Sequence, residues 1–197
     1  MSHTIVIASN NRGKLREIER VLAPLAYTVI PQAQYAIPEA DEPYATFIEN
    51  CLGKARHAAK LTGLAALADD SGICVNALNG APGVHSARYA GTPGSDQNNN
   101  AKLIAALNGI TQRDAYYYCV MVYLRHADDP QPLLAEGRWH GQIIDVPRGG
   151  NGFGYDPHFF IPVLNKTAAE LGLAEKNALS HRGLALASLV AQLQQPR

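Results

Sequence analysis

Ala68-Asp69-Asp70-Ser71-Gly72 places two neighbouring carboxylates, a small hydroxyl and a glycine directly after the apolar run Leu64 to Ala68. Such a run predicts a buried strand that carries charge to the rim of a sheet. Two adjacent carboxylates repel each other unless a cation or a proton offsets their charge. Mg²⁺ suits such a pair, because it takes one or two carboxylates and fills its other positions with water and phosphate oxygens. The segment therefore indicates metal-assisted phosphate chemistry, and an acidic turn after a strand is the alternative.

Strands and helices alternate around this segment, and the middle of the chain is rich in strands. Hydrophobic periodicity and turn residues predict strands at residues 4–8, 27–30, 65–68, 73–78, 116–124, 133–144 and 159–161. Helices are predicted at residues 14–25, 46–63 and 95–107, and two more begin at Thr167 and Ser180. Residues 32–44 are expected to form a loop. This order predicts an α/β fold with a mixed sheet.

The amino-acid composition limits the classes of protein to which this chain can belong. The 197 residues are 47% hydrophobic and 17% charged, which predicts one compact domain over residues 1–197. The net charge is zero, and without a run of Lys and Arg we expect no nucleic-acid partner. Apolar runs are shorter than the roughly 18 residues that span a bilayer, so no membrane partner is expected. Three widely spaced cysteines and the absence of a signal-peptide pattern predict a cytoplasmic protein without structural zinc.

The first of three further polar segments is Ser9-Asn10-Asn11-Arg12-Gly13-Lys14, between the first predicted strand and helix. Backbone N–H groups at a helix N-terminus, together with Ser, Asn and Lys donors, can hold an anion. The segment is not a Walker A loop, because Leu15 replaces the Ser or Thr that would follow the lysine. The alternative is an Asn-Gly turn with a helix cap.

The second is the glycine cluster at residues 149–154, which leads into Phe153-Gly154-Tyr155-Asp156-Pro157. It does not match G-x-G-x-x-G, so a dinucleotide fold is not indicated. Glycines beside an aromatic side chain can let a flat ring approach the backbone and stack. The alternative is a mobile hairpin loop.

The third is Ser180-His181-Arg182-Gly183, which opens the last predicted helix. Ser180 is a good N-cap, and His181 and Arg182 would present donors suited to an acceptor on a ligand. Lys176, shortly before, adds a cation. The alternative is a capped and solvated helix end.

Taken together, these segments resemble one family, the inosine/xanthosine triphosphate pyrophosphatases, and among them the bacterial dITP/XTP enzymes. The matching motifs run in order along the chain: S-x-N-x-x-K at Ser9 to Lys14, T-F-I-E-N at Thr46 to Asn50, A-D-D-S-G at Ala68 to Gly72, G-A-P-G at Gly80 to Gly83, F-G-Y-D-P at Phe153 to Pro157 and S-H-R at Ser180 to Arg182. The resemblance implies a two-lobed fold, a long mixed sheet flanked by helices, an active site in the cleft between the lobes, and a homodimer. The implied reaction converts a deaminated purine nucleoside triphosphate (ITP, dITP or XTP) and water to the monophosphate and pyrophosphate, with Mg²⁺.

The resemblance also assigns roles to residues. Glu42 and Asp70 are the implied metal ligands, and Asp70 would also orient or deprotonate the attacking water. Neighbouring strand residues face opposite ways, so Asp69 and Asp70 can share a metal only if the strand breaks between them. Asp69 is therefore expected to lie beside the metal ligands. Lys54 and Glu49 are expected there as well, and a surface lysine on a helix is the alternative for Lys54.

The remaining residues are expected to bind substrate. The triphosphate would lie on the loop at residues 9–14. The base would stack on Phe153, and donors at residues 180–182 would bind a 6-keto oxygen, which adenine lacks. Rejection of GTP requires exclusion of its 2-amino group, by a residue that the sequence does not identify. The full set of expected substrate-binding residues is Ser9, Asn10, Asn11, Arg12, Gly13, Lys14, Ser71, Phe153, Gly154, Tyr155, Asp156, Lys176, His181 and Arg182.

Two other functions stay open at this point. One is a nucleotide sensor that binds without turnover, although the carboxylates would weaken triphosphate binding unless a metal is present. The other is a pyrophosphatase of related fold that acts on modified pyrimidine nucleotides. A panel of ITP, XTP, GTP, dTTP and UTP separates these functions.

Overall fold

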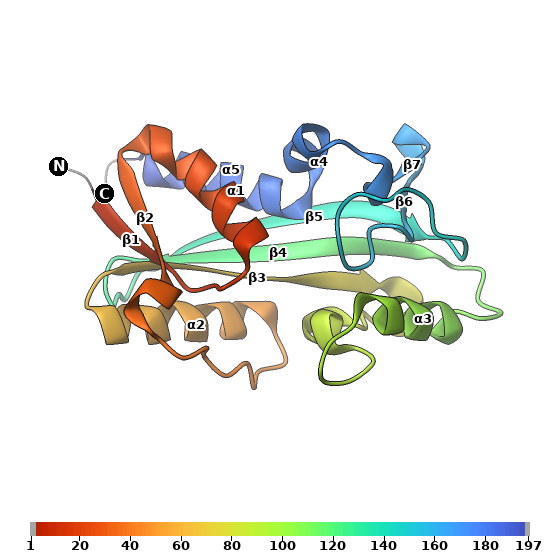
Figure 1. Cartoon of the computed structure of the whole chain (residues 1–197), viewed down its shortest axis with the longest axis horizontal. Coiled ribbons are helices and arrows are strands. Elements are labelled where there is room, and N and C mark those ends of the chain that lie inside the picture. Colours follow the sequence, from red (N-terminus) through yellow and green to blue (C-terminus); the bar gives the residue numbers. More distant parts are fainter. Residues whose placement is uncertain (1–2, 196–197) are drawn as a thin grey trace. The chain divides into compact units, whose positions relative to one another are not determined.

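The computed structural model describes residues 3–195 (Figure 1). The chain divides into two compact units. Unit 1 comprises Met1–Asp70, Val120–Glu136 and Ala185–Arg197, and unit 2 comprises Ser71–Cys119 and Gly137–Leu184. The organisation as a single two-lobed domain stays a prediction. No helix within residues 3–195 has both the length and the apolar character needed to cross a bilayer.

Within residues 3–195, the strands form one seven-stranded sheet in the order β2-β1-β3-β4-β5-β6-β7. Strand β1 pairs in parallel with both β2 and β3, so that Ile5 lies opposite Val29 and Ala65. Strand β6 pairs antiparallel with both β5 and β7. The predicted α/β fold with a mixed sheet is therefore confirmed. The strands are β1 His3–Ile7, β2 Tyr27–Pro31, β3 Ala65–Val75, β4 Asp114–Leu124, β5 Leu133–Ile143, β6 Phe159–Ile161 and β7 Lys166–Thr167.

In unit 1, helices α1 (Arg12–Leu22) and α2 (Phe47–Thr62) lie on opposite faces of the sheet (Figure 1). The predicted capping box of α2 is confirmed: the Thr46 hydroxyl accepts from the Glu49 backbone N–H at 3.3 Å and donates to Glu49 Oε2 at 2.6 Å. The helix ends at Gly63, which has the positive φ of 69° that glycine adopts without strain.

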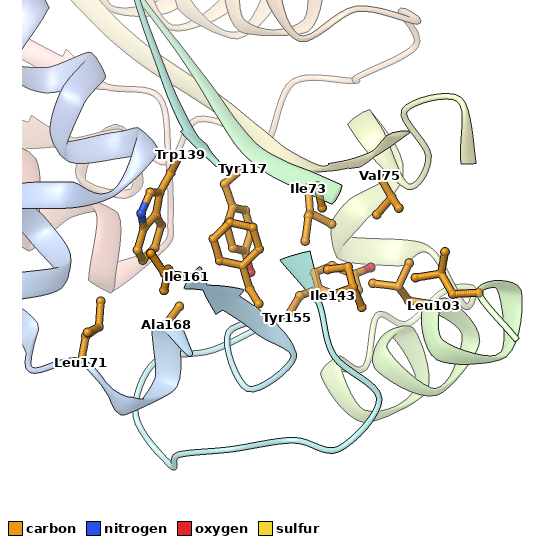
Figure 2. Close-up of a cluster of buried hydrophobic side chains, with 13 residues drawn as sticks. Ile73, Val75, Leu103, Tyr117, Trp139, Ile143, Tyr155, Ile161, Ala168 and Leu171 are labelled. Carbon is orange, nitrogen blue, oxygen red and sulfur yellow. The ribbon is translucent and has the colours of Figure 1, made fainter. Parts of the chain in front are cut away.

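In unit 2, a cluster of buried hydrophobic side chains, several of them aromatic, draws residues from β3, β4, β5 and β6 (Figure 2). The Tyr117 and Phe159 ring centroids lie 4.7 Å apart, and those of Trp139 and Phe159 lie 5.3 Å apart. Leu103 of α3 closes the opposite end of the cluster from Trp139 in the view of Figure 2. The remaining helices are α3 Asp96–Ala106, α4 Leu173–Leu179 and α5 His181–Leu193, and short 3-10 turns occupy residues 23–25, 32–35, 76–78, 83–88, 162–164 and 168–170.

The prediction of two strands at residues 65–68 and 73–78 is wrong, because β3 runs without a break from Ala65 to Val75. The polar residues between the two apolar runs stay in the sheet because each finds a partner. Asp69 pairs with Lys14, Asp70 pairs with Lys54, and the Ser71 hydroxyl accepts from Arg182.

The prediction of a helix that begins at Thr167 is also wrong. Thr167 and Glu170 do form a capping box, but it closes only the 3-10 turn Ala168–Glu170. Leu171 is buried in the core with extended backbone, and this ends the turn before α4 can begin. Helix α1 begins two residues earlier than predicted and ends at Leu22, and a 3-10 turn containing Pro24 follows it.

The turn between β4 and β5 is built around Asp129, whose carboxylate has no solvent exposure. It accepts from the Arg125 backbone N–H at 3.0 Å, from Arg125 Nε at 2.9 Å and from the Gln131 backbone N–H at 3.0 Å. The hydrogen bonds from Arg125 hold the pKa of Asp129 well below its usual range. Because the folded pKa is lowered, this carboxylate contributes stability above the unfolded pKa of about 3.9 and loses it as the pH falls.

We predict that Asp129→Ala lowers the free energy of unfolding by about 2 kcal/mol at pH 7, because Arg125 and two backbone donors lose a charged acceptor. Denaturant unfolding followed by circular dichroism measures the change. Asp128→Ala, at the exposed neighbouring carboxylate, is the control and should stay within about 0.5 kcal/mol of the wild type. Equal losses in the two variants would contradict this role for Asp129.

Candidate active site

The loop before α1 is organised by its own side chains. Asn11 is the N-cap, and its Oδ1 accepts from the backbone N–H of Gly13 at 2.9 Å and of Lys14 at 3.1 Å. Ser9 Oγ accepts from the Asn11 N–H at 3.2 Å, and Asn10 Nδ2 donates to Glu39 at 2.9 Å. Arg12 begins the helix, and its side chain lies outside the described part of the structure. The loop is therefore an ordered helix N-terminus that favours an anion.

Lys14 reaches from the first turn of α1 to the sheet. Its Nζ lies 2.8 Å from Asp69 Oδ2, and the Asp69 side chain has no solvent exposure. The ion pair stabilises the buried carboxylate and fixes the position of the ammonium group beside the loop.

Lys54 on α2 makes a second ionic contact, with two carboxylates. Its Nζ lies 2.7 Å from Glu42 Oε1 and 3.1 Å from Asp70 Oδ1. Burial raises the pKa of the Asp70 carboxyl above its usual value, and this outweighs the opposing effect of Lys54. Burial opposes the charge of Lys54, but Asp70 and Glu42 together raise its pKa.

The two adjacent aspartates therefore belong to different charge clusters. Successive residues of an unbroken strand face opposite sides of the sheet, and α1 and α2 cover those opposite sides. Asp69 faces Lys14, and Asp70 faces Lys54. The condition for a shared metal, a break of the strand between them, is not met.

The donor set around Lys54 fits Mg²⁺. Glu42 and Asp70 already place oxygens within hydrogen-bond distance of one cationic atom. Among the residues that the structure describes, no three His, Cys, Asp or Glu side chains gather into a complete metal cage. Two carboxylates, with water and phosphate oxygens completing the shell, is the arrangement that Mg²⁺ favours.

Two other expected residues of the A-D-D-S-G and T-F-I-E-N motifs lie elsewhere. Glu49 is exposed and hydrogen-bonds Thr46, so it caps α2. Ser71 belongs to unit 2, where its Oγ accepts from Arg182 Nη2 at 3.2 Å.

The segment after the glycine cluster is folded around the Asp156 carboxylate. Asp156 Oδ2 accepts from the Phe153 backbone N–H at 2.9 Å and pairs with Lys176. Lys176 Nζ also lies 5.0 Å from the centre of the Phe153 ring, which is 54% exposed. Gly152 has φ 78°, and a Cβ there would collide with the Asp156 carboxylate. The segment is thus a platform held together by side-chain contacts, with an accessible ring.

Helix α3 holds the same segment through residues that the sequence analysis missed. The Gly154 backbone N–H donates to Asp96 Oδ2 at 2.7 Å, and Asn100 Nδ2 donates to the Gly154 carbonyl at 2.8 Å. The only sequence signal was the polar first turn of this helix. Tyr155 is buried in the core, where its hydroxyl donates to the Ser86 carbonyl at 2.8 Å, so its side chain is not at the surface of the platform.

His181 and Arg182 are both buried at the start of α5. The His181 ring stacks on Tyr117, with centroids 4.7 Å apart and an angle of 10° between the planes. The Tyr117 hydroxyl lies 3.3 Å from Asp156 Oδ1. Unit 2 therefore brings Phe153, Asp156, Lys176 and His181 into one connected group, and Tyr117, which was not predicted, connects its two halves.

The Ham1 family model matches residues 5–192 of the chain. A dITP/XTP pyrophosphatase of Ralstonia nicotianae is 64% identical over 192 residues, which cover 96% of each chain. A dITP/XTP pyrophosphatase of Neisseria meningitidis serogroup B is 59% identical over 190 residues, again 96% of each chain.

Solved structures show the same fold. A HAM1 protein from Coxiella burnetii is 47% identical, with a TM-score of 0.95 over 98% of this chain and 100% of that one. A nucleoside-triphosphatase / dITP/XTP pyrophosphatase from Mycobacterium abscessus is 42% identical, with a TM-score of 0.79 over 97% of this chain and 100% of that one.

We predict that Lys54→Met lowers the free energy of unfolding by about 1–3 kcal/mol at pH 7, because two partly buried carboxylates lose their shared cation. Without the lysine, the pKa of Asp70 rises further above its unfolded value, so the deficit is larger at pH 7 and becomes smaller as the pH falls toward about 3.9. Urea unfolding at the two pH values measures this. The control is Lys60→Met, an exposed lysine on the same helix, and an equal effect there would contradict the prediction.

Proposed function

The chain belongs to the Ham1 family, and from this premise we propose that it is a nucleoside triphosphate pyrophosphatase that acts on deaminated purine nucleotides. Its substrates are ITP, dITP and XTP, and its products are the nucleoside monophosphate and pyrophosphate. The bond that breaks joins the α and β phosphates. Removal of these nucleotides prevents their incorporation into DNA and RNA.

The observation that carries the proposal is the 64% identity, over nearly the whole of both chains, to a protein named dITP/XTP pyrophosphatase. The charge clusters of unit 1 supply the chemistry that such a reaction needs. Hydrolysis of a phosphoanhydride depends on neutralising charge and positioning water more than on covalent chemistry by the protein.

Glu42 and Asp70 would hold Mg²⁺. When bound, the ion neutralises phosphate charge and makes a nearby water more acidic. The ammonium group of Lys54 contacts both carboxylates and so holds them close together. Burial raises the pKa of Asp70, which makes it a stronger proton acceptor than an exposed carboxylate, while the charge of Lys54 favours its ionised form. Asp70 therefore orients the attacking water and accepts its proton.

Lys14 and the start of α1 would bind the triphosphate. The ammonium of Lys14 is held at the loop by Asp69, so little side-chain entropy is lost when phosphate oxygens approach. The dipole of α1 adds favourable potential at the same place.

Unit 2 supplies the groups for the base. The exposed Phe153 ring offers a stacking surface, and Ser180, His181 and Arg182 offer donors to a 6-keto oxygen, with Lys176 as a further cation. A buried donor left without a partner by adenine costs about 1–3 kcal/mol. The homodimer, the cytoplasmic location and the absence of a nucleic-acid partner stay predictions.

Product analysis tests the proposal directly. We predict that ITP and XTP yield one pyrophosphate per nucleotide in the presence of Mg²⁺, and that EDTA abolishes turnover until Mg²⁺ is restored in excess. Enzyme-coupled pyrophosphate assays and ³¹P NMR distinguish pyrophosphate from orthophosphate. Release of orthophosphate would show that another bond breaks, and faster hydrolysis of dTTP or UTP than of ITP would favour a pyrimidine enzyme.

The two aspartates should differ when each is changed to asparagine. We predict that Asp70→Asn lowers kcat by about 10²–10⁴, because it removes a proton acceptor and a metal ligand. Asp69→Asn mainly raises KM for every base, because Lys14 loses the partner that positions it. Circular dichroism checks that both variants fold. An active Asp70→Asn variant, or the same kinetic change in both, would refute this division of roles.

A further inference from the structure

Tyr117 is a buried residue of β4 that contacts both halves of the base-binding group in unit 2. Its ring stacks on His181 at 4.7 Å, and its hydroxyl lies 3.3 Å from Asp156 Oδ1. His181 begins α5, whereas Asp156 is the carboxylate around which the Phe153 segment folds. Tyr117 touches both, although it belongs to none of the six motifs.

We infer that Tyr117 is a positioning residue for base selection, which fixes the His181 ring and the Asp156 carboxylate relative to each other. This inference rests on the proposed function, because it concerns the choice between a 6-keto and a 6-amino purine. Tyr117 itself acts only through its two neighbours.

The ring of Tyr117 is a rigid support. It packs against Phe159 at 4.7 Å on its own side of the sheet and lies beside Trp139, with 6.4 Å between ring centroids (Figure 2). A histidine side chain has two rotatable bonds, and a stacked neighbour that cannot move restricts both. A donor is selective only when it is held within about 0.5 Å of its productive position, and packing of this kind provides that support.

The hydroxyl of Tyr117 completes the environment of Asp156. Oδ2 of that carboxylate is taken by Lys176 and the Phe153 N–H, and Oδ1 by Tyr117. The carboxylate is thus held at both oxygens. Burial, together with the charge of Asp156, raises the pKa of Tyr117 well above its usual value, so the hydroxyl remains a donor throughout the working pH range.

If Tyr117 only filled the core, its substitution would have a different effect on the kinetics. Its loss would reduce the amount of folded enzyme and lower the rates with all nucleotides by the same factor. A positioning residue for base selection changes the ratio of kcat/KM for ITP to kcat/KM for ATP. The two roles are therefore separated by comparing substrates on one preparation.

The test compares three variants. Tyr117→Leu removes the stacking ring, and we expect kcat/KM for ITP to fall about tenfold or more while kcat/KM for ATP changes little. Tyr117→Phe keeps the ring and should restore most of the ratio, with a loss of about two- to fivefold for the missing hydroxyl. Tyr118→Leu changes the next residue of the strand, whose ring lies under Arg138 on the other face, and should leave the ratio at the wild-type value.

An unchanged ratio in a folded Tyr117→Leu variant overturns the inference, as does an equal shift in Tyr118→Leu. If Tyr117→Leu does not fold, Tyr117→Phe decides, because an equal change on ITP and ATP would then refute the role. NMR gives a readout that needs no activity: the His181 ring protons should be shifted upfield in the wild type and in Tyr117→Phe. Failure of the wild type to release pyrophosphate from ITP would refute the proposed function, whereas an active wild type with no such shift would refute only the role of Tyr117.

Discussion

The alternation of side chains along β3 is the constraint on which the first unit depends. Asp69 and Asp70 are neighbours in an unbroken strand, so they must face opposite sides of the sheet. A buried carboxylate is costly without a cation, so each side requires one. Helices α1 and α2 cover the two sides, and each provides a lysine whose ammonium group contacts the aspartate on that side. The positions of both helices therefore depend on two adjacent residues, Asp69 and Asp70.

The sequence was sufficient to predict structural features that depend only on neighbouring residues. The cap at Thr46, the stop at Gly63 and the alternation of strands and helices depend on neighbouring residues, and these predictions hold. The break predicted in β3 failed because polar residues end a strand only when they have no partner within the fold. Lys14 lies 55 residues from Asp69 in the sequence, and Lys54 lies 16 residues from Asp70. Hydrophobic periodicity gives no information on contacts at such separations.

The same limit applies to the groups that we propose to support base recognition. Phe153, His181 and Arg182 stand out because they lie in motifs with glycine or at a helix start. Tyr117 lies in a run of three tyrosines on a strand, a pattern typical of an ordinary sheet, and Asn100 lies on a polar helix face. Their roles arise from contacts to Asp156 and Gly154, more than 35 residues away along the chain. Only the fold reveals such contacts, so these residues could not be predicted.

The basicity of Asp70 follows from two opposing effects on its charge. Burial raises its pKa and so strengthens it as a proton acceptor, while Lys54 opposes that rise and favours the charged form. With burial alone, the neutral form would be favoured more strongly, and a protonated carboxyl group cannot accept a proton. With Lys54 alone, its pKa would fall and it would be a weaker base than an exposed aspartate. A carboxylate that must stay charged and still take a proton from water needs both, which is why a lysine that contacts both Glu42 and Asp70 suits this position.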